Sequence, residues 1–174
     1  MFQEIAKVGA VVAAGMVGVA SIGNAVGRIF WAWISDAITR RWTFVTMFLL
    51  QVGLFWILPS TSSVTMLTVL SFIILMCYGG GFGTMPAFTA DYFGSKNVGP
   101  IYGLMLTAWG SASAFGPLLI AHMRQSSGSY TSGLHVIAGI VAASMILPIL
   151  VSPPKSAAAV STSSSPGVSV MHSR

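Results

Sequence analysis

Long apolar runs with almost no charge alternate with short polar segments along this chain. Five such runs occupy residues 8–34, 43–60, 64–88, 100–121 and 133–151, and only the first contains a charged residue. Roughly 17–25 helical residues cross the hydrocarbon core of a bilayer, so each run is long enough for one span. No segment shows the two-residue alternation of a β-strand. The pattern predicts an all-α fold, a polytopic bundle of five transmembrane helices.

The polar segments between the runs indicate an orientation. If segments 35–42 and 89–99 lie on one side, that side and the chain's end hold five Lys or Arg, against two on the other side. Because Lys and Arg are enriched in cytoplasmic loops, we expect the richer side to be cytoplasmic. The tail, 152–174, is rich in Ser, Pro and Ala, which predicts a disordered cytoplasmic segment.

Composition supports the membrane assignment and excludes other classes. Of 174 residues, 55% are hydrophobic and 6% are charged, whereas soluble domains have about 25% charged residues. The net charge of +5 does not indicate nucleic-acid binding, because the eight Lys and Arg form no basic stripe. The single cysteine, Cys77, provides no disulfide or metal framework, and we expect no metal and no cofactor. The runs contain no catalytic pair, so we expect no enzyme.

Arg28 is the most informative residue, because it lies inside the first run. A cation at that depth costs roughly 2.5–3.5 kcal/mol on insertion scales unless an anion or water offsets it. All three acids of the chain lie outside or at the ends of the runs: Glu4, Asp36 and Asp91. The planar guanidinium matches a carboxylate in bidentate fashion. The sequence therefore predicts a site for a small organic anion at Arg28.

A polar stripe surrounds Arg28 in the first run. Its members fall at helical spacing on one face: Ser21, Asn24, Arg28 and Ser35. Such a stripe is expected to face the bundle interior. Asn24, one turn before Arg28, is a candidate to orient the arginine or to bind the same ligand. The alternative is structural: Arg28 extends to the membrane interface, or forms an ion pair with Asp36.

Two aromatic residues are further candidates for substrate binding. Tyr78 in the third run and Trp109 in the fourth lie away from the interfaces where such rings usually gather. Either side chain lines the transport path or fills the bundle core; the sequence leaves both open.

Small residues punctuate the runs. Gly23 and Gly27 are four residues apart, as are Gly79 and Gly83, a spacing typical of closely packed membrane helices. A moving gate is the alternative use of these glycines. Pro86 is expected to end or bend the third run.

Charges at the ends of the runs are candidates for gating. Asp36, Arg40 and Arg41 lie between the first two runs, and Asp91 follows the third on the same side. Asp91 can pair with Arg40 or Arg41 across the inner surface and hold it closed. Simple solvation of the loop is the alternative.

The segment 35–42 resembles the loop signature of the major facilitator superfamily, roughly Gly-x-x-x-Asp-Arg-x-Gly-Arg-Arg. Ala32, Ala37 and Thr39 stand where that superfamily usually has Gly, Arg and Gly. The stretch CYGGGFGTMPAFTADYFGSKNVGPIYGLMLTAWGSASAFGP, residues 77–117, looks like helices 10 and 11 of the oxalate/formate antiporter family within that superfamily. Together with GNAVGRIFWAWISD, the resemblance covers the chain to about residue 151.

The resemblance implies that the five runs are helices 8 to 12, a partial C-terminal half. The missing N-terminal half would then be a partner, and the residue matching Arg28 would bind the substrate carboxylate. Related monocarboxylate transporters have an Asp where this chain has Asn24. The oxalate transporter pairs its arginine with a lysine on helix 11, and run 100–121 has no lysine. This difference favours a monoanion, such as formate.

The expected function is secondary active transport of a small organic anion by alternating access between two halves. The chain would be a fragment of that transporter, embedded in the lipid bilayer. A truncated membrane protein that transports nothing is the alternative.

Overall fold

A computed structural model of the chain describes residues 7–151, and every regular element in that range is a helix. The elements are α2 (Ala10–Ile38), α3 (Arg40–Ile57), η1 (Leu58–Ser60), α4 (Val64–Phe93), η2 (Ser95–Asn97), α5 (Val98–Ser127), α6 (Thr131–Ser144) and α7 (Ile146–Leu150). Five of the helical segments are long and apolar enough to cross a membrane. The predicted all-α fold with five spans is confirmed for the described residues. The tail predicted to be disordered lies outside them.

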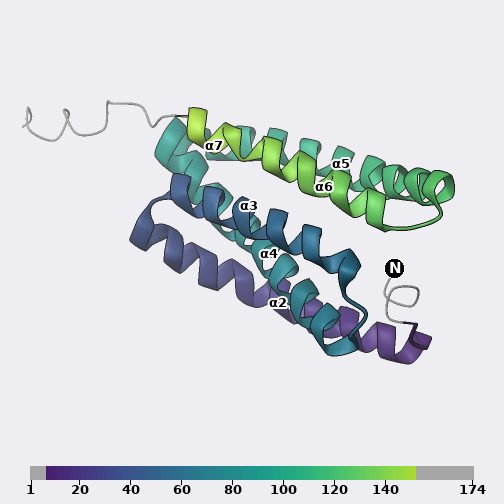
Figure 1. Cartoon of the computed structure of the whole chain (residues 1–174). Coiled ribbons are helices and arrows are strands. Elements are labelled where there is room, and N and C mark those ends of the chain that lie inside the picture. The colour runs from purple at the N-terminus through teal and green to yellow at the C-terminus, as the bar shows by residue number, and fades with distance from the viewer. Residues whose placement is uncertain (1–6, 152–174) are drawn as a thin grey trace, which may run out of the picture.

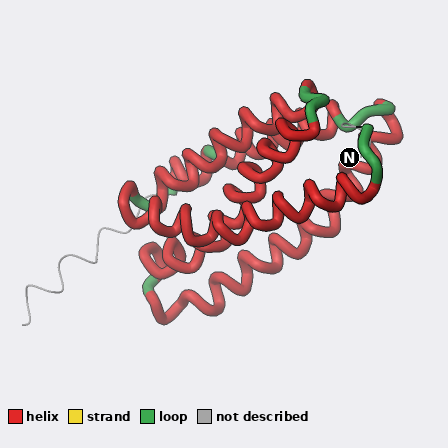
Figure 2. Tube along the Cα trace, turned by 90° about the horizontal axis from the view of Figure 1, so that it is seen from below, coloured by secondary structure: helices red, strands yellow, loops and turns green. Residues whose placement is uncertain are grey.

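The helices lie side by side, and the loops gather at the two ends of the bundle (Figures 1 and 2). In Figure 1, α2 lies on one side, α5, α6 and α7 lie on the other, and α3 and α4 lie between them. Helices α2 and α4 are parallel neighbours, and their last turns lie at the same end of the bundle as the start of α3.

Several helices extend beyond the apolar runs. Helix α2 continues to Ile38, and α4 continues to Phe93, past the polar residues at the end of each run. Intrahelical hydrogen bonds do not require an apolar side chain, so hydrophobicity marks the membrane core rather than the helix end. Pro86 lies inside α4, which continues through it. The last span is divided at Met145, whose backbone N–H bonds to the carbonyls of Val141 and Ala142.

Helices α2 and α4 make the closest contact in the bundle through glycine. Four glycines lie where their backbones touch: Gly23, Gly27, Gly79 and Gly83. A Cβ added at Gly27 would overlap the backbone of Met76, and one at Gly83 would overlap the backbone of Arg28. Small residues let helices approach closely in lipid, where no hydrophobic force drives them together. The predicted packing role of these glycines is confirmed, and a gating role stays a prediction.

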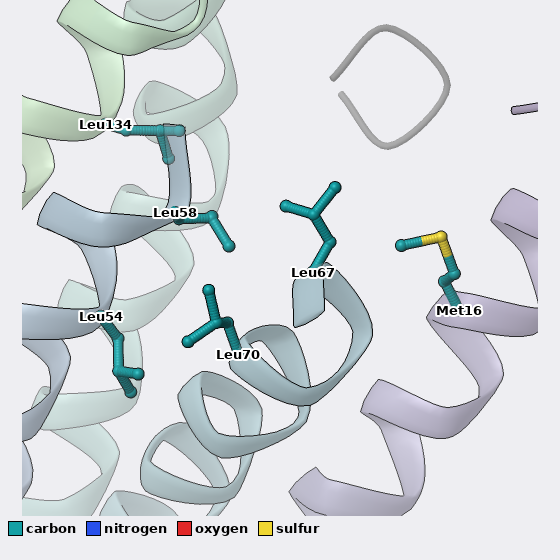
Figure 3. Close-up of a cluster of buried hydrophobic side chains, with 6 residues drawn as sticks. All are labelled: Met16, Leu54, Leu58, Leu67, Leu70 and Leu134. Atoms are coloured by element: carbon teal, nitrogen blue, oxygen red, sulfur yellow. The ribbon is translucent and has the colours of Figure 1, made fainter. Parts of the chain in front are cut away.

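Two buried apolar clusters join the helices. The first connects α2, α3, η1, α4 and α6 (Figure 3), and its members are Met16, Leu54, Leu58, Leu67, Leu70 and Leu134. The second connects α2, α3 and α4 nearer the other end, through Trp31, Phe44, Met47 and Cys77. Helix α5 has no buried residue within the described range, so its contacts with the rest of the bundle are the most open. This open side lies beside the candidate site.

Candidate functional site

Arg28 lies within the membrane-spanning helix α2, on the side that faces α4. Its backbone packs against Gly83, while its side chain is exposed at the edge of the helix contact. The guanidinium carbon lies 6.0 Å from the ring centroid of Phe82 on α4, at the outer limit of a cation–π interaction. Among residues 7–151, no carboxylate forms an ion pair with it. The expected alternative pair with Asp36 is not formed, because Asp36 pairs with Arg40.

Phe82 belongs to a cluster of three aromatic side chains from two helices. The Phe82 ring contacts Tyr78 one turn earlier on α4, at a centroid distance of 5.3 Å, and Trp109 of α5 at 5.4 Å. Both contacts have an edge-to-face geometry, which aromatic pairs favour. The indole Nε1–H of Trp109 donates a hydrogen bond to the Tyr78 hydroxyl. Helices α2, α4 and α5 thus bring Arg28, Tyr78 and Trp109 together around Phe82.

Phe82 is the central member of this cluster, and the sequence did not single it out. Its signal was its position four residues after Tyr78, on the same face of the third run. An apolar residue in an apolar run carries no mark of function, so only the packing of α5 against α4 shows its place.

Asn24 is located differently from Arg28. It is half-buried in the contact between α2 and α4, with its side-chain oxygen close to Gly79. That oxygen is buried and accepts no hydrogen bond from the described residues. Of the four residues in the expected polar stripe, Ser35 alone is buried. Helix α2 turns its glycine face toward α4 because that face allows the closest approach, so the polar stripe does not define the buried side.

A cavity of about 220 Å³ opens beside the aromatic cluster, between α3, α4 and α5. Tyr78, Phe82 and Trp109 form part of its wall, and most of the remaining lining is apolar. Gln51 of α3 is a polar exception, and its side-chain amide donates to the backbone carbonyl of Ile74 at 3.4 Å. Arg28 is not part of the lining, although the Phe82 ring that it contacts is.

A second group of polar residues joins three helix ends at one end of the bundle, which the sequence predicts to be the inner side. The Arg40 guanidinium pairs with Asp36 at the end of α2, and through Nε with Asp91 near the end of α4, at 3.0 Å. It also donates to the buried hydroxyl of Ser35 at 3.0 Å. The expected ion pair of Asp91 with one of the two arginines is therefore formed by Arg40. We call Ser35, Asp36, Arg40 and Asp91 the inner ion network.

Arg41 is not part of the inner ion network. Its guanidinium donates to the backbone carbonyl of Ile149 in α7, and its charge lies 6.0 Å from the ring of Trp42. The cation thus fastens the last described helix to α3. Backbone carbonyls at a helix C-terminus are a favourable place for a cation.

A family model described as Major Facilitator Superfamily matches residues 3–172 of the chain. The chain belongs to this superfamily. It is therefore an integral, multi-pass membrane protein of a transporter superfamily rather than of an enzyme family, and its five long apolar helices fit a partial bundle of the superfamily's fold.

Part of the chain is also similar to one characterised carrier protein. The chain is 30% identical over 96 residues to "Apicoplast pyruvate carrier 2" of Toxoplasma gondii. The match covers 54% of this chain and 15% of that relative, so the chain spans only a small part of its length. The superfamily match does not distinguish the oxalate/formate antiporter family, which stays a prediction.

Proposed function

We propose that this chain is part of a secondary transporter that carries a small organic anion by alternating access. In this proposal Arg28 binds the carboxylate of the substrate. One observation supports it above the others: a guanidinium within a membrane-spanning helix has no carboxylate partner in residues 7–151. Membership of the superfamily supports transport, and the relative named as a pyruvate carrier supports a small organic anion.

The energetics favour an anionic ligand at Arg28. A cation–π contact is worth about 0.5–2 kcal/mol, whereas the cation itself costs roughly 2.5–3.5 kcal/mol at the centre of a membrane. The Phe82 ring therefore offsets only part of the cost. The contact with the ring face also uses none of the guanidinium N–H donors in a hydrogen bond. A substrate carboxylate can accept two of them in parallel.

The charge near the site favours a monoanion such as formate or another small monocarboxylate. Arg28 is the only cation of the described aromatic cluster, and the one Lys or Arg of α5, Arg124, lies in its last turn. A dicarboxylate would need a second cation for its second charge. Exchange of oxalate for formate is the more specific form of this proposal, and it rests on the resemblance of residues 77–117 alone.

The proposal requires a second bundle. In secondary transporters the substrate site lies near the midplane, between two repeats that rock against each other. The described helices supply one side of such a site. Helices 1 to 7 of the superfamily fold would supply the other, and the inner ion network would then hold the cytoplasmic side closed.

Uptake measurements test the proposal. The full-length protein that contains this chain is reconstituted in liposomes and supplied with labelled formate, pyruvate or oxalate. A hydrogen bond to a charged group contributes about 1.5–3 kcal/mol, so Arg28→Ala should reduce the initial rate of uptake about 10- to 100-fold. Arg28→Lys keeps the charge without the planar fork and should recover only part of the rate.

Arg41→Ala provides the matched control, since it removes a guanidinium at the membrane edge without touching the cluster. Uptake by Arg28→Ala at the rate of the unchanged protein would remove Arg28 from the substrate site. Absence of uptake in every form, with a folded protein, would support the alternative of a membrane protein that transports nothing.

A further inference from the structure

Thr39, the single residue between α2 and α3, has a backbone conformation that threonine rarely adopts. Its φ is 102° and its ψ is 146°. This region is populated almost only by glycine, and a β-branched residue with positive φ is a genuine outlier. The residue therefore holds conformational strain.

Gly94 provides an internal comparison. It follows α4 at the same end of the bundle, and its φ of 82° and ψ of 148° are close to those of Thr39. Each residue ends its helix with the same backbone hydrogen bond, from Thr39 to Ser35 at 3.3 Å and from Gly94 to Ala90 at 3.0 Å. Two helix ends thus share one geometry, and only one of them has the residue type that adopts it freely.

Among the described residues, the threonine side chain has no hydrogen-bond partner that would compensate for the strain. Thr39 is also the residue at which α3 begins, yet its hydroxyl does not cap that helix. The first turn of α3 contains no acid and begins with two cations, Arg40 and Arg41. The positive end of the helix dipole lies at the N-terminus, so cations there are unfavourable. The local sequence alone therefore does not stabilise this conformation.

Contacts on both sides of Thr39 hold it in place. Arg40, the next residue, is fixed by the inner ion network to Asp36 and Asp91. On the α3 side, the backbone N–H and the hydroxyl of Thr43 both bond to the Thr39 carbonyl, at 3.1 and 2.9 Å. Closing the network fixes the position of Arg40. Thr39 is the one residue between Asp36 and Arg40 that lies outside a helix, and the one among them with a positive φ.

We propose that Thr39 is a strained joint that opposes closure of the inner ion network, so that this chain opens more readily at its inner surface than one with glycine there. Opening releases Arg40 from the two acids, and Thr39 then relaxes to an ordinary negative φ. The inference concerns the helices described here and does not depend on which substrate is carried.

A cysteine introduced at the buried position 35 can be used to measure how often the inner ion network opens. Ser35 is 2% exposed and accepts a hydrogen bond from Arg40, so a thiol introduced by Ser35→Cys reacts with a water-soluble maleimide only when the network opens. The reporter is placed in a Cys77→Ser background, which removes the single native thiol. Labelling of the full chain in liposomes is followed over time, and full labelling in denaturant checks that the thiol is present.

Thr39→Gly should slow labelling by about 5- to 150-fold, which corresponds to the usual strain of such a residue. Gly94→Thr introduces the same strain at the matched helix end and should speed labelling. Ser62→Gly adds a glycine in a loop of ordinary backbone conformation and should leave the rate unchanged. Labelling of Thr39→Gly at the parent rate, or faster, would overturn the inference.

A second comparison tests whether the network holds the strain. In an Arg40→Gln background the joint is already free to relax, so Thr39→Gly should change the labelling rate less than twofold. The same large effect in both backgrounds would show that the strain, if present, is unrelated to the network and would overturn the inference. Thr39→Gly is expected to fold at least as well as the parent, so the two backgrounds decide the question even if Gly94→Thr does not fold.

Discussion

At the scale of single residues, Phe82 gives Arg28 its surroundings. The ring contacts the guanidinium and both members of the hydrogen-bonded pair, Tyr78 and Trp109. Its contact with the cation is weaker than the cost of burying a charge in lipid, so it orients Arg28 without neutralising it. An anionic ligand would offset the rest of the cost of placing this charge in the membrane.

Phe82→Leu should therefore raise the substrate concentration for half-maximal uptake about two- to fivefold, the equivalent of 0.5–1 kcal/mol. The maximal rate should change less, because Arg28 is still present. Phe82→Tyr keeps the aromatic face and should resemble the unchanged protein. Phe48→Leu is the matched control, because Phe48 lines the same cavity as Phe82, whereas the recorded cation–π contact of Arg28 is with Phe82. Equal shifts in Phe82→Leu and Phe48→Leu would contradict an orienting role.

The hydrogen bond between Trp109 and Tyr78 makes a separate prediction about stability. A net contribution of about 0.5–1.5 kcal/mol is usual for such a bond, and α5 has few other close contacts. Trp109→Phe and Tyr78→Phe should each lower the midpoint of thermal unfolding in detergent. The double variant should be little worse than the more damaging single one, since both remove the same bond. Additive losses would show that the two groups act independently.

At the scale of elements, glycine determines how α2 meets α4. The two backbones approach so closely that a methyl group at several positions would overlap a backbone atom of the other helix. This contact also explains why α2 buries Ser35 and half of Asn24 while Arg28 remains at the edge. The arrangement of the candidate site is thus a consequence of small residues that have no chemical role in it.

Gly27→Ala and Gly83→Ala should each separate the two helices and destabilise the bundle by about 1–3 kcal/mol, as overpacking usually does. Gly53→Ala in α3 is the control, because an added Cβ there meets nothing within 4 Å and alanine favours the helix. Unfolding by mixed detergent, followed by circular dichroism, measures the difference. A Gly83→Ala protein as stable as the Gly53→Ala protein would contradict the close contact.

At the scale of the whole molecule, one end of the bundle holds an ion network that joins three helices. The inner ion network joins α2, α3 and α4 there, and Arg41 joins α3 to α7. Exposed ion pairs contribute only about 0–1 kcal/mol each. A transporter's two states differ by only a few kcal/mol, so even weak pairs shift the balance between them.

Arg40→Gln should therefore speed labelling of the Ser35→Cys thiol by up to about fivefold per lost ion pair. Arg41→Gln removes the same charge from the neighbouring position but leaves both acids paired, so the rate should not change. An equal acceleration in the two variants would indicate general loosening of the inner surface rather than opening of the network.

The sequence alone determined the five spans, the all-helical class and the unusual position of Arg28. These features follow from the length and polarity of local segments. The thickness of the bilayer sets how long an apolar span must be, whatever the rest of the fold. It also indicated that Asp91 meets an arginine, because alternating spans bring segments 35–42 and 89–99 to one side. The ends of the helices were less well predicted, since polar residues continue a helix beyond the membrane core.

Only the tertiary structure decided which side chains meet. It selected Arg40 over Arg41 as the partner of Asp91, put Phe82 in contact with both Arg28 and Trp109, and put Asn24 against Gly79. It also gave Thr39 its positive φ. These features depend on how one helix is rotated against another, and that rotation is set by packing between residues far apart in the chain, which no local pattern records.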